Sequence, residues 1–257
     1  MCYEEGEGVA KDLEKAVYWW QKAADQGDAG AQFNLGVCYF NGYGVPKDLK
    51  KADYWYQKAA DHGDVEAQFN LGLSYFNGYG VAKDLEKAAY WWQKAAEQEH
   101  VEAQNNLGSC YHDGIGVAKD LAKAVFWHQK AAEQGADQAQ FNLGLSYFNG
   151  GGVAKDLARA VYWYQKSADQ GHADAQLNLG NGYYNGDGVV KDLEKAAYWY
   201  QEAAEQGEAQ AQFYLGACYL DGIGVAKNLA KAVYWWQKAA EQGHENAINV
   251  LNMLKDD

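Results

Sequence analysis

The sequence predicts an all-α solenoid, an α/α array of helix-turn-helix repeats with a 36-residue period. A Leu-Gly pair recurs at that spacing, with its glycine at Gly36, Gly72, Gly108, Gly144, Gly180 and Gly216. Self-similarity at one fixed period of about 20 to 50 residues is typical of repeat arrays. Each repeat holds two helix-patterned segments separated by a glycine-rich loop. In such an array each repeat packs only against its neighbours.

The repeats organise all 257 residues into a single repeat domain. A half-repeat at 1–28 and a capping helix at 245–257 enclose the complete repeats 29–64, 65–100, 101–136, 137–172, 173–208 and 209–244. Met1-Cys2-Tyr3 stands at the end of a helix in this register, so we expect the chain to be a segment of a longer protein. Asn252 replaces the glycine of the Leu-Gly pair in the last half-repeat, which fits a terminal cap with a polar outer face.

The first helix of each repeat, the A helix, has one apolar face. Ala31, Leu35 and Tyr39 follow one another at spacings of four, which places them on one side of a helix. Gly36 lies among them and is expected to let another helix come close. Gly42 ends the helix, because glycine readily adopts the positive φ of a helix C-terminus.

The second helix, the B helix, begins after a capping residue of the same type in every repeat. The position is Asp12, Asp48, Asp84, Asp120, Asp156, Asp192 and Asn228. Asp and Asn are both strong N-caps, so the change to Asn228 preserves the cap and not a charge. The helix is expected to bury Leu49, Ala52, Trp55, Tyr56 and Ala59, below a loop plugged by Val45, and to stop at Gly63. Glu99 replaces that last glycine, so we expect the helix to run on or to be strained there.

These features resemble the Sel1-like repeat, a relative of the tetratricopeptide repeat. The motif A-Q-F-N-L-G-x-x-Y-x-x-G-x-G-V-x-K-D-x-x-K-A-x-x-W-x-Q-K-A-A-x-Q-G is met by residues 67–99, apart from Glu99, and recurs over essentially the whole chain. The tetratricopeptide unit is shorter, at about 34 residues, and lacks the long G-x-G-V loop. The resemblance implies a right-handed superhelix whose A helices line the concave side, and a role as an adaptor scaffold that assembles protein complexes.

A peptide or protein partner is expected to bind the side of the A helices opposite Ala31 and Leu35. We call this surface the A-helix face, and its candidate binding residues are Phe33, Asn34, Phe40, Asn41, Phe69, Asn70, Phe76, Asn77, Asn105, Asn106, His112, Phe141, Asn142, Phe148, Asn149, Asn178, Asn181, Tyr184 and Asn185. Aromatic rings can bury the apolar side chains of a peptide, while Asn can donate to and accept from its main chain. In the alternative interpretation, the rings pack between neighbouring helices and the Asn residues cap loops or bond one another. Repeat 101–136, with Asn105, Ser109 and His112, interrupts the aromatic pattern and is the expected centre of specificity.

A second aromatic row lies on the B helices, on the side facing away from the core. It consists of Tyr18, Tyr54, Tyr90, Phe126, Tyr162, Tyr198 and Tyr234. In the Sel1-like family this place is usually polar, so the sequence departs from the pattern here. An extended exposed apolar row indicates a docking or self-association surface. Alternatively, each ring lies along the lysine four residues on, such as Lys22 or Lys58, in a cation–π contact.

The charge of the chain restricts its partners. A formal net charge of −13 argues against binding nucleic acid or an anionic membrane surface, and favours a weakly basic or apolar partner. No apolar run of about 18 residues is present, so no membrane-spanning segment is predicted. The compartment stays open.

No catalytic, cofactor or metal site is predicted. The G-x-G of each loop follows a helix and not a strand, and no histidine pair has ligand spacing. His100, His172 and His244 occupy an inter-repeat turn that elsewhere holds an acidic residue, so they are interpreted as tolerated surface variants. A hydrolase acting on a cell-wall-like or β-lactam substrate, as proposed for some relatives, would need a nucleophile with a positioned base, which the sequence does not reveal.

The cysteines are expected to remain free thiols. Cys2, Cys38, Cys110 and Cys218 share one register of the repeat. Equivalent positions of stacked repeats lie more than about 10 Å apart, since a B helix intervenes, whereas a disulfide needs Cα atoms within about 7 Å. Packing of small residues explains this position better.

Overall fold

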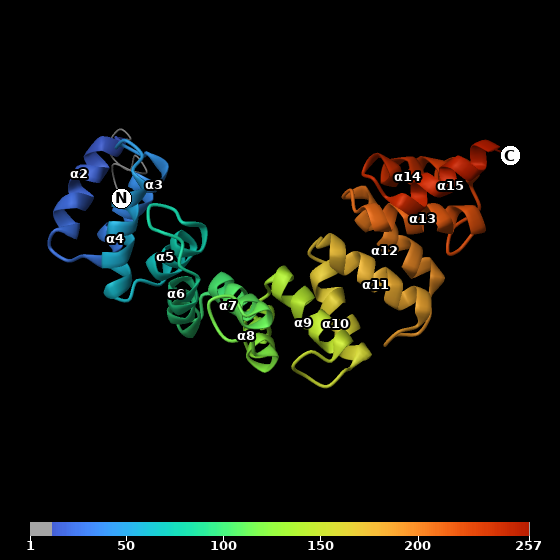
Figure 1. Cartoon of the computed structure of the whole chain (residues 1–257), viewed down its shortest axis with the longest axis horizontal. Coiled ribbons are helices and arrows are strands. Elements are labelled where there is room, and N and C mark those ends of the chain that lie inside the picture. The colour runs from blue at the N-terminus through green and yellow to red at the C-terminus, as the bar shows by residue number, and fades with distance from the viewer. Residues whose placement is uncertain (1–11, 257) are drawn as a thin grey trace. The chain divides into compact units, whose positions relative to one another are not determined.

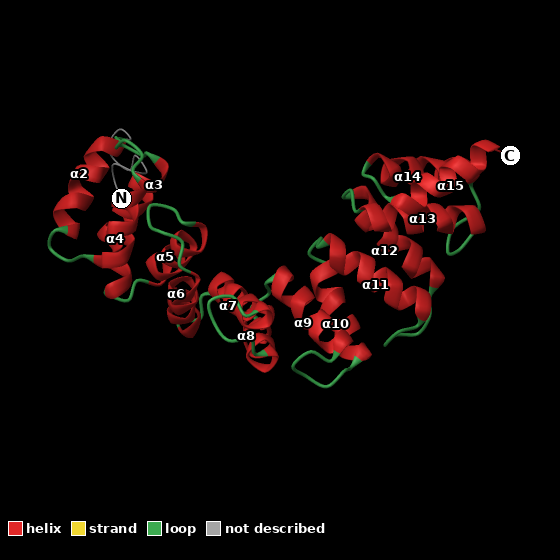
Figure 2. Cartoon of the chain, viewed as in Figure 1, coloured by secondary structure: helices red, strands yellow, loops and turns green. Residues whose placement is uncertain are grey.

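A computed structural model describes residues 12–256, and within this range all regular secondary structure is helical (Figure 2). The half-repeat contributes α2 (Leu13–Ala24). The A helices are α3 (Ala29–Asn41), α5 (Val65–Asn77), α7 (Val101–Asp113), α9 (Asp137–Asn149), α11 (Ala173–Asn185) and α13 (Ala209–Asp221). The B helices are α4 (Leu49–Asp61), α6 (Leu85–Glu97), α8 (Leu121–Glu133), α10 (Leu157–Ala168), α12 (Leu193–Glu205) and α14 (Leu229–Glu241), and α15 (Glu245–Asp256) follows.

The helices form two compact units, 1–127 and 128–257, which divide inside α8. Within each unit, helices that follow one another in the chain pack side by side (Figure 1). In the N-terminal unit α3 packs on α4 and α5 on α6, while α4 also contacts α5. In the C-terminal unit the same holds for α9 through α15. This chain-order stacking of helix pairs is the predicted all-α solenoid.

The predicted caps of the B helices are present. Asp48 Oδ1 accepts a hydrogen bond from the backbone N–H of Lys51 at 3.1 Å, and Asn228 Oδ1 accepts one from Lys231 at 3.0 Å. Asn228 therefore caps its helix in the same way as Asp48, as predicted. Gly42 ends α3 with a φ of 83°, in the left-handed region.

The Leu-Gly pair lies at the centre of each repeat, and its glycine faces the B helix as predicted. Leu179 is fully buried, and a Cβ on Gly180 would lie 2.7 Å from the ring of Tyr200 on the B helix. The glycine thus makes room for an aromatic side chain of the B helix, and the B-helix backbone also comes close, since the same Cβ would lie 3.4 Å from the carbonyl oxygen of Ala196. Of the B-helix stripe, Ala52, Trp55, Tyr56 and Ala59 are buried, while Leu49 is half-buried.

Of the two outcomes expected at Glu99, strain is the one observed. Helix α6 ends at Glu97, and Glu99 has a φ of 68°. It is the one non-glycine residue with positive φ in the described part of the chain. Left-handed backbone costs an L-residue about 1–2 kcal/mol, so the fold imposes this turn against the preference of the side chain.

A ladder of buried glutamines, which we did not predict, joins each helix pair to the preceding one. Gln176 of α11 donates from Nε2 to the carbonyl oxygen of Ala168, at the end of α10, at 3.2 Å. Its Oε1 accepts from Nε2 of Gln206, just past α12, at 2.7 Å. One side chain therefore ties three helices together. Its counterparts, which make the same bond to the preceding B helix, are Gln32, Gln68, Gln104, Gln140 and Gln212.

The interpretation of three histidines as surface variants is wrong. His100 and His172 are the N-caps of α7 and α11, and their Nδ1 atoms accept from the backbone N–H groups of Ala103 and Ala175. Their rings stack on Phe69 and Phe141 of the preceding A helices. His244 repeats the arrangement with Ala247 and Phe213. Histidine here combines the cap of an acidic residue with an aromatic contact.

Candidate functional site

The A-helix face of both units is a half-buried surface of aromatic rings and carboxamides. Phe33 packs on Tyr56 with ring centroids 5.9 Å apart, and Phe141 packs on Tyr164 at 6.0 Å. These inner rings therefore contact the B helix of their own repeat. Meanwhile Ala59 and Leu71 are fully buried, so the apolar stripe and the A-helix face are on the predicted sides.

The outer rings of the face are more accessible. Phe148 and Tyr184 are 39% and 37% exposed, and Phe40 and Phe76 are half-buried. A lysine lies over each ring at 5.3 to 5.5 Å from its centroid: Lys47, Lys83, Lys155 and Lys191. The outer rings of the A-helix face thus each make a cation–π contact with a lysine of the chain.

Several Asn side chains bond their own helix. Asn41 and Asn77 donate from Nδ2 to the carbonyl oxygens four residues earlier, those of Val37 and Leu73. Asn70 does the same to Glu66. The inner rings thus pack between helices as the alternative interpretation expected, whereas these three amides bond carbonyls of their own helix and neither cap loops nor bond one another.

The polar repeat 101–136 does not stand out by its geometry. Asn105, Asn106 and Ser109 are half-buried, and Ser109 Oγ donates to the carbonyl oxygen of Asn105 at 3.2 Å. His112 is exposed, with its Nδ1 2.7 Å from Oδ1 of Asp113. The expectation that this repeat sets specificity stays a prediction.

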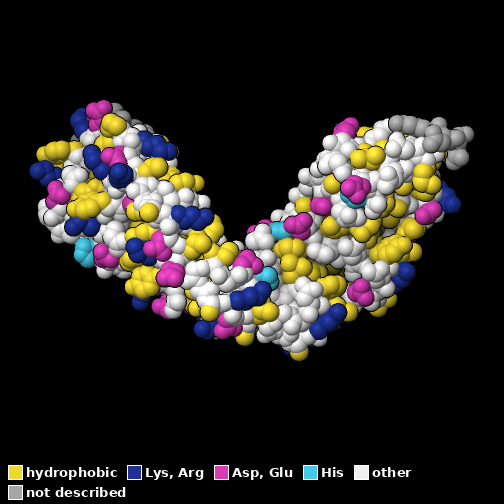
Figure 3. All heavy atoms as spheres, viewed as in Figure 1, with side chains coloured by type: hydrophobic (Ala, Val, Ile, Leu, Met, Phe, Trp, Pro, Cys, Tyr) yellow, Lys and Arg dark blue, Asp and Glu magenta, His cyan; other side chains and the backbone are white. Residues whose placement is uncertain are grey.

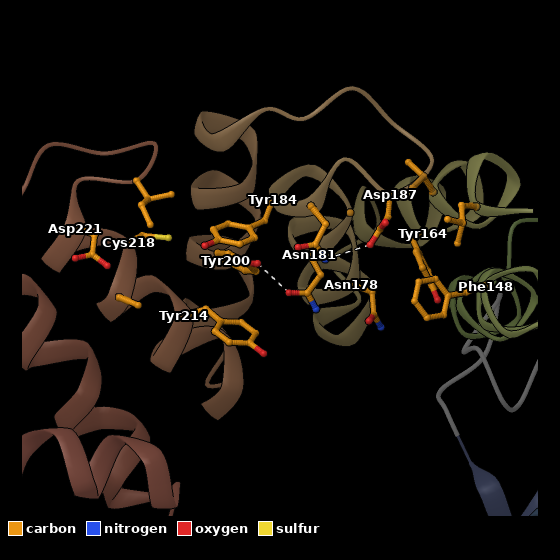
Figure 4. A pocket seen from close by; sticks show the side chains of 16 residues that line it. Phe148, Tyr164, Asn178, Asn181, Tyr184, Asp187, Tyr200, Tyr214, Cys218 and Asp221 are labelled. Carbon is orange, nitrogen blue, oxygen red and sulfur yellow. Dashed lines mark hydrogen bonds between the residues drawn. The ribbon is translucent and has the colours of Figure 1, made fainter.

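A cavity of about 450 Å³ lies in the C-terminal unit, among α9, α10, α11, α12 and α13 (Figure 4). It is lined by predicted binding residues from two repeats: Phe148, Asn178, Asn181, Tyr184 and Asn185. The remaining predicted residues lie outside it. The hydroxyl of Tyr200 donates to Oδ1 of Asn181 at 2.8 Å, which fixes both side chains in the wall.

Small and polar substitutions open this cavity. Asn181 and Gly182 stand where other repeats have Leu73 and Ser74 or Val37 and Cys38. In addition, the loop position of Tyr79 is held by Asp187 in repeat 173–208. Tyr79 contacts Phe40 of the preceding repeat edge to face, at 6.1 Å. At the corresponding loop position of repeat 173–208 there is a carboxylate instead of a ring, and both Asp187 and Phe148 line the cavity.

Sequence reasoning missed several lining residues, among them Tyr164, Asp187 and Tyr200. The cavity could have been predicted from the Asn181-Gly182 pair, which is smaller and more polar than the two residues at the same position of the other repeats. Burial raises the pKa of Tyr200, so its hydroxyl stays protonated and able to donate. Burial, with a smaller effect of Asp221, raises the pKa of Cys218 to about 11.

The B-helix row is exposed, and lysines cover several of its rings. Tyr54 and Tyr162 are 54% and 53% exposed, each in edge-to-face contact with the following tryptophan. Lys22, Lys58, Lys94 and Lys166 lie 5.4 to 5.9 Å from the ring centroids of Tyr18, Tyr54, Tyr90 and Tyr162. The cation–π alternative is confirmed for these four rings, and self-association through the row stays a prediction. Glu202 takes the lysine position after Tyr198.

Other chemistry is sparse in the described part of the chain. Cys38, Cys110 and Cys218 are buried and form no disulfide, whereas Cys2 lies outside the described residues. Residues 12–256 contain no cluster of three His, Cys, Asp or Glu side chains able to hold a metal ion.

Over the same residues, every helix is too short or too polar to cross a bilayer.

Comparison with known proteins places these repeats in a family. The Sel1 repeat model matches residues 1–28, 29–64, 65–100, 101–135, 137–172, 173–208 and 209–244. No curated protein sequence is significantly similar to the chain.

Two solved structures are similar over nearly the whole chain. One is c5321, a protective antigen of uropathogenic Escherichia coli strains displaying an SLR fold, with 40% identity and a TM-score of 0.93. The chain is covered completely and spans 55% of the length of that protein. The other is a Sel1 repeat protein from Oxalobacter formigenes, with 39% identity over 98% of this chain and 73% of that one, and a TM-score of 0.79. With seven matched repeats and these two relatives, the chain belongs to the Sel1 repeat family.

Proposed function

We propose that the chain is a scaffold that binds an extended peptide, or a loop of a protein partner, along its A-helix face. The cavity of the C-terminal unit is the anchor point. The observation that carries this proposal is the convergence of five predicted binding residues on one cavity of about 450 Å³. Cavities of about 300–1,000 Å³ with a few convergent polar groups are typical ligand sites, and Sel1 repeat proteins generally act as protein-interaction scaffolds.

The chemistry of the lining suits a peptide. Asn178 and Asn185 can donate to and accept from a main chain, while Phe148, Tyr184 and Tyr214 offer rings for side chains. The bond between Tyr200 and Asn181 holds part of the wall in place before a partner arrives. Pre-organisation of this kind lowers the entropic cost of binding.

The two other candidate functions have less support. A self-associating array would use the B-helix row, but lysines already lie over four of its rings. A hydrolase would need an activated nucleophile, whereas burial raises the pKa values of Cys110 and Cys218 to about 11, the opposite of activation.

Selection from a library of short random peptides displayed on phage tests the proposal. Peptides selected on the wild-type chain should bind about tenfold more weakly to Asn178→Ala and Tyr184→Ala, since buried aromatic and hydrogen-bonding contacts dominate interfaces. Tyr162→Ala is the matched control, because Tyr162 lies in the same unit on the B-helix row and is 53% exposed. Equal losses in all three variants, or failure to select any peptide, would contradict the proposal.

A further inference from the structure

We infer that the cavity receives an arginine side chain of the bound peptide, whose guanidinium packs on Phe148 and pairs with Asp187. This inference rests on the proposed function and specifies the chemistry of the partner. It follows from comparing the residue at one loop position of the repeat, Tyr79 at one repeat junction and Asp187 at another.

At the junction between repeats 29–64 and 65–100, this place is filled from within the chain. The ring of Tyr79 contacts Phe40 edge to face, and Lys47 also lies over the Phe40 ring, 5.5 Å from its centroid. At the junction between repeats 137–172 and 173–208, Phe148 keeps its lysine, Lys155, at 5.4 Å. The tyrosine, however, is replaced by Asp187. The tyrosine ring thus has no counterpart at this position, and the Asp187 carboxylate lines the same cavity as Phe148.

The charge of the cavity is one-sided. Its charged lining residues are Asp187 and Asp221. Lys155 and Lys191, which lie over the rings of Phe148 and Tyr184, do not line it. Asp187 accepts a hydrogen bond from Asn185 Nδ2 at 3.1 Å, and no Lys or Arg within the described residues forms an ion pair with either carboxylate. Figure 4 shows Asp187 on the Phe148 side of the pocket and Asp221 at the far end. In a half-enclosed aromatic site, such a charge is screened less than on an open surface.

Arginine suits this combination better than other side chains. Its planar guanidinium stacks on an aromatic face and offers paired donors to a carboxylate at the same time. A neutral apolar side chain would fill the space beside Phe148 but would remove water from Asp187 without compensation. The net charge of −13 also favours a basic partner.

The test is a double-mutant cycle on peptides selected from the random library. In a peptide that depends on Asn178 and Tyr184, the arginine is replaced by citrulline, its neutral isostere. Binding is measured by fluorescence polarisation to the wild-type chain and to Asp187→Asn. Asp113→Asn is the matched control: Asp113 shares the repeat position of Asp221 but lies outside the cavity and contacts His112.

Either change alone should weaken binding about tenfold, the usual scale for a charge-assisted hydrogen bond. Citrulline should cost little more in Asp187→Asn, and Asp113→Asn should bind like the wild type. The inference is overturned if the citrulline penalty is the same with and without Asp187. It is also overturned if the selected peptides depend on Asn178 and Tyr184 but carry no arginine, in which case the proposed function stands. Peptides that bind without depending on Asn178 and Tyr184 would overturn both.

Discussion

Replacement of Gln176 by methionine should destabilise the C-terminal unit by about 2–3 kcal/mol. Gln176 is 3% exposed, and its carboxamide makes two hydrogen bonds, one to the carbonyl of Ala168 and one from Gln206. Methionine has a similar volume, so the cavity term is small. Each neutral hydrogen bond contributes about 1 kcal/mol, and a buried carbonyl left without its partner adds to the cost. The side chain of Gln206 is exposed and can turn to water, which limits the total.

The measurement is urea unfolding followed by tryptophan fluorescence, with hydrogen exchange read separately for α10, α11 and α12. Because a repeat array can unfold in parts, faster exchange should appear first in these three helices. The control is Gln93→Met. Gln93 is exposed and donates only to Glu97 four residues on, at 2.9 Å, a contact worth about 0.2–0.5 kcal/mol. If Gln176→Met costs no more than Gln93→Met, the glutamine ladder does not hold the repeats together.

Three further changes test other parts of the fold. Glu99→Gly should raise stability by about 0.5–1 kcal/mol, because glycine removes the left-handed strain at a φ of 68° but has more entropy when unfolded; an unchanged thermal midpoint would argue against strain. Gly180→Ala should lower stability by about 1–3 kcal/mol, since its Cβ would lie 2.7 Å from the Tyr200 ring. Gly30→Ala, at an exposed helical position, should instead raise stability by about 0.5–1 kcal/mol. A change of the same sign in both variants would refute the packing role of Gly180. Asp53 is buried, its Oδ2 lacks a hydrogen-bond partner, and burial raises its pKa from 3.8 to about 6. The folded chain therefore holds this proton more tightly than the unfolded chain, and the contribution of Asp53 to stability is lost as pH rises from about 4 to about 6. Valine occupies the equivalent position of the preceding repeat, at Val17. In Asp53→Val the fall of the urea unfolding midpoint between pH 5 and pH 8 should therefore disappear, whereas it should persist in Asp61→Ala, on the exposed side of α4.

The periodic features of the chain were predictable because each depends on local backbone chemistry. The spacing of Leu35 and its equivalents, the N-caps at Asp48 and Asn228, and the left-handed Gly42 all follow from rules that act within one helix or turn. The change at Glu99 was visible for the same reason. The family match and the helix order agree with these predictions.

Contacts between repeats were harder to foresee. The buried role of Gln176 depends on a carbonyl eight residues earlier and a side chain 30 residues later, which no single helix pattern reveals. His100 was misread because its acceptor nitrogen and its stacking on Phe69 become evident only when both neighbouring helices are placed.

The candidate site was predicted only in part. Asn178, Asn181, Tyr184 and Asn185 were assigned to the A-helix face, but emphasis fell on the polar repeat with His112. The cavity arises from the loss of bulk at Gly182 and Asp187, whose consequence depends on the ring of the preceding repeat. Such a space between repeats cannot be deduced from one repeat alone.

A crystal structure of the chain with a library-selected peptide tests the central claim most directly. The claim predicts an extended peptide along α9, α11 and α13, with an arginine side chain between Phe148 and Asp187 and its main chain bonded to Asn178 or Asn185. A peptide seated on the B-helix row beside Tyr162 and Tyr198, with the cavity holding only water, would contradict it.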